Sequence, residues 1–165
     1  MLILNDRQIR QKIKRLALEI VEKNYTYSTI IIVGINNKGY AFAELLSKEV
    51  GMVHEGKVQL RRLKINPASP VEHPIYIENF DENDFNDAAI ILTDDVANTG
   101  RTLFYAFKPL LEKMLSSLQV AVLVDRKHKT FPILVYFVGL SLATTFDENI
   151  QVKFDNTQEL SVFLN

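Results

Sequence analysis

The sequence predicts an α/β fold in which helices cover both faces of a mostly parallel central sheet. Three observations predict it. Short apolar runs at residues 29–33, 88–92 and 120–124 indicate strands that are buried on both faces. Stretches with apolar residues at helical spacing lie between these runs, and this alternation is typical of a parallel sheet. The length of 165 residues, 47% of them apolar, suits a single domain over residues 1–165.

The first predicted elements are a helix and a strand-turn-helix unit. Asn5 can cap the first helix, because Gln8 lies three residues later, in the capping-box position. The apolar residues of this helix recur at helical spacing and should face the core: Ile9, Ile13, Leu16 and Ile20. The strand at 29–33 ends at Gly34, and a turn at 36–39 follows. A second helix should then pack back on the strand through Phe42, Leu45, Leu46 and Val50.

The middle of the chain predicts a second strand at 58–65 and an irregular loop at 66–74, where three prolines interrupt regular structure. The next buried strand, at 88–92, leads to a helix over 102–118, which Pro109 should kink. The apolar residues expected on the core side of that helix are Leu103, Ala106, Phe107, Leu110, Met114 and Leu118.

The last third predicts strands at 120–124, 135–138 and 151–154, followed by a short helical tail. The alternation of strands and helices along the chain favours a mostly parallel sheet that is covered on both faces.

Composition excludes several classes of function. Nineteen Lys and Arg balance twenty Asp and Glu, so no whole-molecule field attracts nucleic acid or an anionic membrane. The absence of cysteine excludes disulfides, thiolate metal sites and a cysteine nucleophile. No apolar run approaches the length that spans a bilayer, and the start of the chain lacks a signal-peptide pattern. We therefore expect a cytoplasmic protein that does not bind membranes.

The segment at 90–102 carries the strongest functional signal. A buried strand ends in the paired acids Asp94 and Asp95, and a polar loop containing Gly100 joins it to a helix start. Ligands of parallel sheets bind outside the carboxyl ends of the strands, and the backbone N–H groups of such a loop favour an anion. Adjacent carboxylates repel phosphate but suit hydroxyls or a metal, so a ribose 5-phosphate satisfies both parts. For the dipeptide alone, simple helix capping would be the favoured interpretation, but the whole string in its strand-turn-helix context favours a ligand.

This string resembles the 5-phosphoribosyl-1-pyrophosphate (PRPP) loop of type I phosphoribosyltransferases. Within that superfamily, the chain is most similar to bacterial bifunctional regulators of the pyrimidine operon with uracil phosphoribosyltransferase activity. The resemblance runs from about Asn5 to Asp155. Two other segments support it in family order: residues 31–35 with Gly39, and residues 121–126 with His128, Pro132, Val138 and Gly139. It implies the type I phosphoribosyltransferase fold, with a small hood beside the sheet.

The resemblance also implies the roles of individual residues. Asp94 and Asp95 would be catalytic and bind the ribose hydroxyls of PRPP. The 5-phosphate cradle would consist of Ala97, Asn98, Thr99, Gly100, Arg101 and Thr102. The pyrophosphate loop would be Asn36, Asn37, Lys38 and Gly39, although Lys38 fits a solvated lysine equally well. The base pocket would contain Arg126, Phe137 and Val138, of which the last two could equally be strand core.

The chain departs from related patterns in three places. Asn98 and Asp125 stand where 6-oxopurine enzymes have an acid and a lysine, so a purine substrate is disfavoured. The regulator family's longer lid loop with its Tyr-Arg pair is replaced by a shorter, proline-containing connection that lacks the pair, which could impair turnover without abolishing binding. Arg61, Arg62 and Lys64 could replace lid contacts, but the exposed side of a strand is the favoured interpretation. After Gly139, the family's Gly-Lys-Asn segment is replaced, so base specificity stays open.

We therefore predict an enzyme that transfers the phosphoribosyl group of PRPP to a nucleobase, with uracil favoured, and releases pyrophosphate. Mg²⁺ would be required and carried by PRPP, with no dedicated protein cage. The alternatives are a PRPP binder without turnover and a regulator that binds RNA. RNA-binding candidates would be Arg7, Arg10, Lys14, Arg15, Lys127 and Lys129. By the resemblance, we expect a homodimer or higher homo-oligomer.

Overall fold

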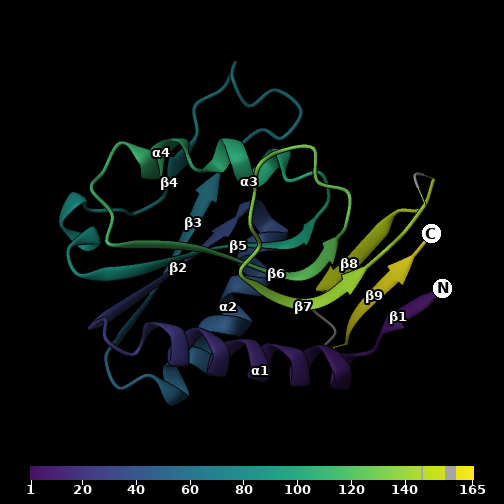
Figure 1. Ribbon diagram of the computed structural model, residues 1–165, viewed down its shortest axis with the longest axis horizontal. Coiled ribbons are helices and arrows are strands. Elements are labelled where there is room, and N and C mark those ends of the chain that lie inside the picture. The colour runs from purple at the N-terminus through teal and green to yellow at the C-terminus, as the bar shows by residue number, and fades with distance from the viewer. Residues whose placement is uncertain (146, 155–158) are drawn as a thin grey trace.

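The computed structural model describes residues 1–145, 147–154 and 159–165, and its centre is a six-stranded sheet (Figure 1). The strand order is β4-β3-β2-β5-β6-β7, and every neighbouring pair is parallel except the antiparallel β3 and β4. The strands are β2 (Thr29–Ile35), β3 (Lys57–Lys64), β4 (Tyr76–Ile77), β5 (Ala88–Ala97), β6 (Ser117–Arg126) and β7 (Phe137–Leu142). The mostly parallel α/β sheet predicted from the sequence is confirmed.

Helices cover both faces of this sheet, as predicted (Figure 1). The long helices α1 (Asp6–Asn24) and α2 (Asn36–Val53) pack on one face and enclose one apolar cluster. The short helices α3 (Arg101–Ala106) and α4 (Lys108–Leu111) cover a second cluster on the other face. A single turn of 3₁₀ helix, η1 (Glu82–Phe85), precedes β5. No helix in the described part of the chain is long and apolar enough to cross a membrane.

The start of α1 has the predicted capping box. Asn5 Oδ1 accepts a hydrogen bond from the Gln8 backbone N–H at 2.9 Å, and the Asn5 backbone N–H donates to Gln8 Oε1 at 3.0 Å. These bonds satisfy N–H groups that lack partners within the helix. All four apolar residues predicted to face the core are buried: Ile9, Ile13, Leu16 and Ile20.

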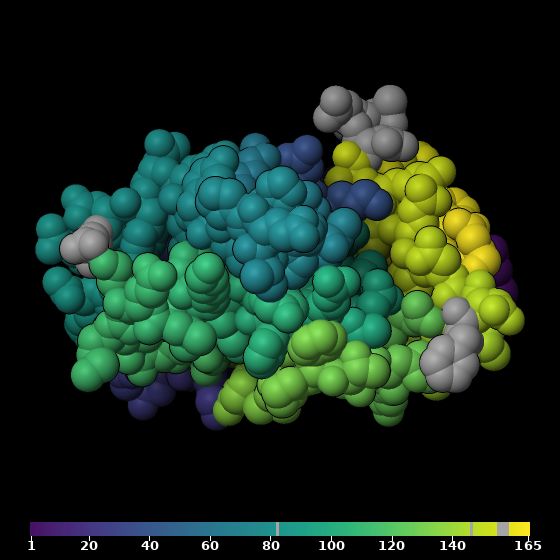
Figure 2. Space-filling view, turned by 90° about the horizontal axis from the view of Figure 1, so that it is seen from above, coloured from purple at the N-terminus to yellow at the C-terminus, as the bar shows by residue number. Residues whose placement is uncertain are grey.

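A second, three-stranded sheet forms the predicted hood at one side of the molecule (Figure 1), where Figure 2 shows the yellow end of the chain beside the purple N-terminus. Its strands are β1 (Leu2–Leu4), β8 (Ile150–Phe154) and β9 (Leu160–Leu164), in the antiparallel order β1-β9-β8. The predicted helical tail is wrong, because residues 160–164 form the central strand β9. This strand pairs with β1 on one side and β8 on the other, and it buries Leu160 and Val162. Residues 155–158, including Asp155, lie outside the described residues.

The helix predicted over 102–118 is also wrong. It is replaced by α3 and α4, and β6 already begins at Ser117. Pro109 lies in the first turn of α4. Because a proline has no N–H to donate, it begins a new helix there and does not merely kink a continuous one. Met114, predicted in the core, is 97% exposed.

Several boundaries differ from the prediction around the carboxyl ends of the strands, and β2 and β6 each extend two residues beyond their predicted ends. The predicted turn at 36–39 is the first turn of α2. Strand β5 continues through Asp94 and Asp95 to Ala97, because it pairs with β6 along this length. Strand β7 begins at Phe137 and extends to Leu142, again through pairing with β6.

Gly34 tests how tightly α2 packs on β2. A Cβ added there would lie 2.5 Å from the Cα of Tyr40, a backbone atom that cannot move alone. We expect Gly34→Ala to lower the free energy of unfolding by at least about 1–3 kcal/mol, the usual cost of overpacking. Urea denaturation followed by circular dichroism measures this change.

Gly51→Ala is the matched control, because Gly51 lies in α2 and an added Cβ meets nothing within 4 Å. Alanine there should raise the free energy of unfolding by up to about 1 kcal/mol through helix propensity. Equal effects of the two variants would contradict the close packing at Gly34.

Candidate active site

Asp94 and Asp95 lie near the end of β5, where α2 approaches the sheet. The preceding Thr93 is buried, and its hydroxyl donates to the carbonyl oxygen of Val33 at 3.2 Å, which ties β5 to β2. A Cβ added to Gly39 would lie 3.1 Å from Asp94 Oδ1 and 3.0 Å from the Thr93 carbonyl oxygen. The structure therefore brings Asp94 against the first turn of α2, which contains the predicted residues 36–39.

The carboxyl group of Asp94 is electrostatically strained. Burial raises its pKa well above the usual range, and the neighbouring Asp95 carboxylate raises it further. The positive charge of Lys38 acts in the opposite direction. Asp94 Oδ1 also accepts a hydrogen bond from the Asp95 backbone N–H at 2.9 Å. A cation or hydroxyl donors beside this pair would relieve the repulsion between the two carboxylates.

The loop at 97–102 folds around Gly100, whose φ of +84° is left-handed. This conformation favours glycine, and an added Cβ would also lie close to the side chains of Ile133, at 3.3 Å, and Lys129, at 3.4 Å. The carbonyl oxygen of Thr99 accepts hydrogen bonds from the backbone N–H groups of Thr130 at 3.0 Å and Phe131 at 3.1 Å. The segment at 129–133 therefore holds the loop in place.

This loop and Asp94 line one small recess of about 50 Å³. Its lining includes all six residues predicted for the 5-phosphate cradle: Ala97, Asn98, Thr99, Gly100, Arg101 and Thr102. Asp95 does not line it. The recess thus combines a polar, glycine-containing loop with one carboxyl group, which is the pairing expected for a phosphate beside a hydroxyl-bearing carbon.

The four residues predicted as a pyrophosphate loop take different positions. Asn36 has a φ of +51°, and its amide donates to the Ile65 carbonyl oxygen at 2.9 Å and accepts from the Ile65 N–H at 3.0 Å. Asn36 therefore fixes the end of β3. Asn37 and Lys38 line a cavity of about 410 Å³ between α2 and β8 of the hood. Helix α2 has no side-chain cap and no acid in its first turn.

Arg126 connects the loop to the segment after β7. One guanidinium N–H group donates to Asn98 Oδ1 at 3.2 Å, and Nε donates to Thr144 Oγ1 at 2.7 Å. The other terminal nitrogen donates to the carbonyl oxygen of Thr145 at 3.0 Å. Lys129, four residues after Asp125, pairs with its carboxylate and extends its side chain over Gly100. The sequence analysis missed Thr144 and gave Lys129 no role at the loop, although the Asp125–Lys129 spacing was a usable signal.

The predicted base-pocket residues do not meet. Phe137 is only 4% exposed and packs in the core beneath α1 and α2. Val138 pairs with Val122, four residues before Arg126 along β6, on the order of 13 Å at ~3.3 Å per residue. The Val138 carbonyl oxygen accepts a hydrogen bond from Arg15 at 2.7 Å. The structure thus assigns Phe137 to the core.

The basic residues of β3 are half-buried, so their interpretation as the exposed side of a strand is wrong. Arg61 pairs with Asp84 at 3.4 Å. The Arg62 guanidinium lies over the Tyr40 ring, 4.0 Å from its centroid, and Lys64 faces Tyr76 across the β3–β4 pair. Arg61 is therefore paired with η1 through Asp84, whereas Arg62 lies against Tyr40 of α2.

Comparison with known proteins gives consistent matches. The sequence matches the phosphoribosyl transferase domain over residues 2–156. The Bifunctional protein PyrR of Clostridium kluyveri is 33% identical, with 92% of this chain and 89% of the relative covered. The PyrR protein of Bacillus mycoides is 32% identical, with 95% and 92% covered.

Solved structures confirm the predicted fold class. The hypoxanthine phosphoribosyltransferase of Trypanosoma cruzi superposes with a TM-score of 0.75 at 15% identity, covering 98% of this chain and 94% of that one. The hypoxanthine phosphoribosyltransferase of Staphylococcus aureus gives a TM-score of 0.72 at 18% identity, covering 88% and 80%. At these identities, the likeness concerns the fold alone.

The strained carboxyl group predicts a pH-dependent effect of Asp94→Asn. A raised pKa means that the native chain binds this proton more tightly than the unfolded chain, so ionisation at neutral and higher pH destabilises the native state. We expect the neutral amide to raise the melting temperature at pH 7 and 8, by about 2–4 °C for each kcal/mol relieved. The gain should shrink as the pH falls toward 4, where the wild-type carboxyl group is protonated.

Scanning calorimetry across this pH range measures the difference. Asp147→Asn is the control, because Asp147 is exposed and should show no such gain. A melting temperature of Asp94→Asn that is lower than wild type at pH 8 would contradict the electrostatic strain.

Proposed function

This chain belongs to the phosphoribosyl transferase domain family, and we propose on that premise that it transfers the phosphoribosyl group of PRPP to uracil or a similar pyrimidine. The family makes the chain a phosphoribosyltransferase. The donor, the accepting base, the metal and the residue roles are the parts that we propose. The observation that carries them is the shared recess of Asp94 and the Gly100 loop, beside the first turn of α2.

The loop at 97–102 would hold the 5-phosphate, and Asp94 and Asp95 would bind the ribose hydroxyls. A phosphate needs donors, which the loop backbone and the hydroxyls of Thr99 and Thr102 supply. The pyrophosphate would face the start of α2, an 18-residue helix whose partial positive charge no acid in its first turn offsets. The Lys38 ammonium adds a full positive charge on the same turn.

The reaction would proceed by attack of a base nitrogen on the anomeric carbon as the bond to pyrophosphate breaks. Positive charge develops on the ribose ring in the transition state, and the carboxylates of Asp94 and Asp95 would stabilise it. Holding the 5-phosphate in the loop fixes the ribose relative to the incoming base, which lowers the entropic cost of the transfer. The base proton would pass to solvent, because the neighbouring Asn98 cannot accept it.

The acid pair also fits Mg²⁺. Carboxylate oxygens are the ligands that Mg²⁺ prefers, and a positive ion would relieve the repulsion that raises the Asp94 pKa. Within the described residues, no group of three or more His, Cys, Asp or Glu could hold a metal. Asp94 and Asp95 would therefore hold the ion together with oxygens of PRPP. When bound, it would offset the negative charge that builds up on pyrophosphate.

The preference for a pyrimidine rests on Asn98 and Asp125. Asn98 accepts a hydrogen bond from Arg126, and Asp125 pairs with Lys129, so neither side chain offers the acid and lysine pair of 6-oxopurine enzymes. Arg126 lies next to the phosphate loop and presents a guanidinium group that can donate to a carbonyl oxygen of a base.

A second candidate function is RNA-dependent regulation, because the curated relatives are named bifunctional. Several basic candidates have intramolecular partners: Arg10 pairs with Asp6, Arg15 with Glu19, and Lys129 with Asp125. These pairs reduce the positive charge available to RNA, which makes this the weaker candidate.

RNA binding predicts a salt-dependent shift of a labelled pyrimidine-operon leader in a gel assay. Lys14→Ala should weaken binding and reduce the salt slope by about one. The absence of any shift at low salt would remove this candidate function. An affinity that does not change with salt concentration would contradict binding through contacts to the RNA phosphates.

The test of the main proposal is pyrophosphate release from PRPP and Mg²⁺ with uracil, orotate, hypoxanthine, guanine or xanthine supplied separately. We expect release with uracil, reduced roughly 100-fold by Asp95→Asn, because the charge that stabilises the transition state is lost. Asp147→Asn should leave the rate unchanged.

Release with a purine would correct the choice of base. Silence with all five bases, in a protein that still binds PRPP by calorimetry, would leave a phosphoribosyl-pyrophosphate binder without turnover and contradict the proposal.

A further inference from the structure

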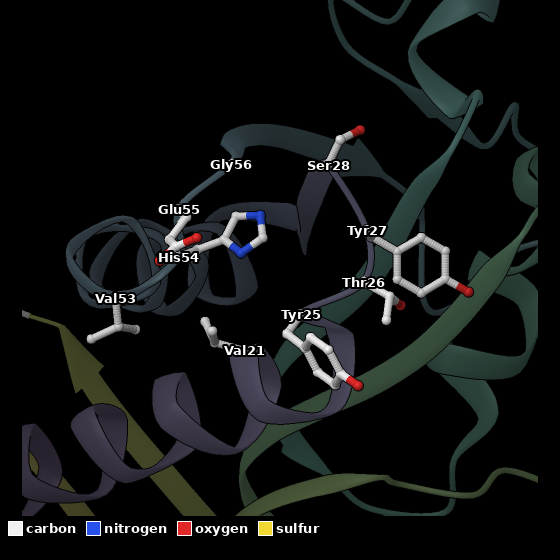
Figure 3. Close-up of a pocket in the computed structure, with 9 residues that line it drawn as sticks. All are labelled: Val21, Tyr25, Thr26, Tyr27, Ser28, Val53, His54, Glu55 and Gly56. Atoms are coloured by element: carbon white, nitrogen blue, oxygen red, sulfur yellow. The ribbon is translucent and has the colours of Figure 1, made fainter.

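A cavity of about 580 Å³ lies at the opposite end of the sheet from the phosphate loop (Figure 3). The end of α1, the connection into β2 and the connection from α2 into β3 form its walls. It lies at the amino ends of β2 and β3, so the length of β2 separates it from residue 36, on the order of 20 Å at ~3.3 Å per residue. None of the residues discussed for phosphoribosyl transfer lines it. Its volume is typical of small-molecule sites.

The electrostatic environment of this cavity favours cations. Both long helices end at it, and the carboxyl end of a helix carries a partial negative charge. Helix α2 has no basic residue in its last turn. Helix α1 has Lys23 there, but Lys23 does not line the cavity, and its ammonium group lies 5.2 Å from the centroid of the Tyr136 ring. Glu55 adds a full negative charge at the rim. Within the described part of the chain, no lysine or arginine lines the cavity.

The walls combine apolar surface with a hydrogen-bonding group. Val21 and Val53 come from the ends of the two helices, and Figure 3 shows the His54 imidazole on the side of the cavity that faces Ser28. His54 Nε2 is buried and has no hydrogen-bond partner among the described residues. The exposed ring of Tyr25, at the end of α1, adds an aromatic face of the kind that attracts organic cations.

These features select one class of ligand. An inorganic anion is excluded by the charge, and a bound metal ion is disfavoured because no group of three or more His, Cys, Asp or Glu occurs within the described residues. A linear aliphatic amine has an alkyl chain for the valines and N–H donors for Glu55, the helix carbonyl groups and an imidazole nitrogen. We propose that this cavity is a binding site for a linear aliphatic di- or polyamine.

Calorimetric titration with putrescine at low ionic strength tests the proposal. We expect saturable binding at one site, weakened about three- to fivefold by Glu55→Gln, which removes one exposed charge. Val21→Lys should abolish binding, because it places a competing ammonium group inside the cavity without disfavouring the helix. The diol with the same carbon chain lacks the charge and should not bind.

Glu112→Gln is the matched control, since Glu112 is an exposed acid outside the cavity. No saturable binding to wild type would overturn the proposal. Equal weakening by Glu112→Gln and Glu55→Gln would also overturn it, because the amine would then follow only the diffuse charge of the surface.

The location is tested by amide chemical shifts in the ¹⁵N-labelled chain. Putrescine should move the signals of residues 21–28 and 53–56, and shifts confined to residues 94–102 would overturn the proposal. Pyrophosphate release by Glu55→Gln should equal that of wild type. The amine titration therefore still tests the cavity if the protein does not catalyse phosphoribosyl transfer. The transfer assay likewise still tests the proposed function if putrescine does not bind.

Discussion

The close approach of the first turn of α2 to the carboxyl ends of β2 and β5 determines the geometry of the candidate active site. Gly34 and Gly39 permit it, because a Cβ at either position would meet backbone atoms at 3.0 Å or less. This contact places Lys38 where its charge acts on Asp94 and directs the start of an 18-residue helix toward the same edge of the sheet. The positive and negative groups of the site therefore come from separate elements that only backbone packing brings together.

That packing also concentrates like charge. Asp94 and Asp95 are consecutive residues of β5, and the pairing of Asp94 with Val122 and of Val96 with Val124 fixes the backbone on both sides of Asp95. Burial adds to the repulsion and raises the Asp94 pKa. A sequence optimised for stability alone would have an amide or an apolar residue there. In the proposed reaction, the ribose hydroxyls and the cation would relieve this strain when the substrate binds.

Local signals in the sequence predicted much of the fold, and long-range pairing decided the remainder. The capping box of Asn5 and Gln8 depends on residues three apart, and the buried runs of β2 and β5 are continuous in sequence. The fate of residues 160–164 depends instead on pairing with residues 2–4, at the other end of the chain. The same holds for the candidate site. The loop at 97–102 is continuous in sequence, and it was predicted as a unit. The hydrogen bonds of Asn36 to Ile65 and of Arg126 to Thr144 join distant segments, and the sequence did not predict them.

Arg126 and Lys129 show how distant segments could make the loop selective. Lys129 covers Gly100 and pairs with Asp125, while Arg126 joins Asn98 to Thr144 and the Thr145 carbonyl oxygen. These bonds use three of the five guanidinium N–H groups, and they fix the orientation in which the other two could donate to a base. A base whose carbonyl oxygen meets these two groups in that orientation would bind better than one that requires an existing bond to break. Selectivity for the base would then be set by the segment after β7 as much as by the phosphate loop itself.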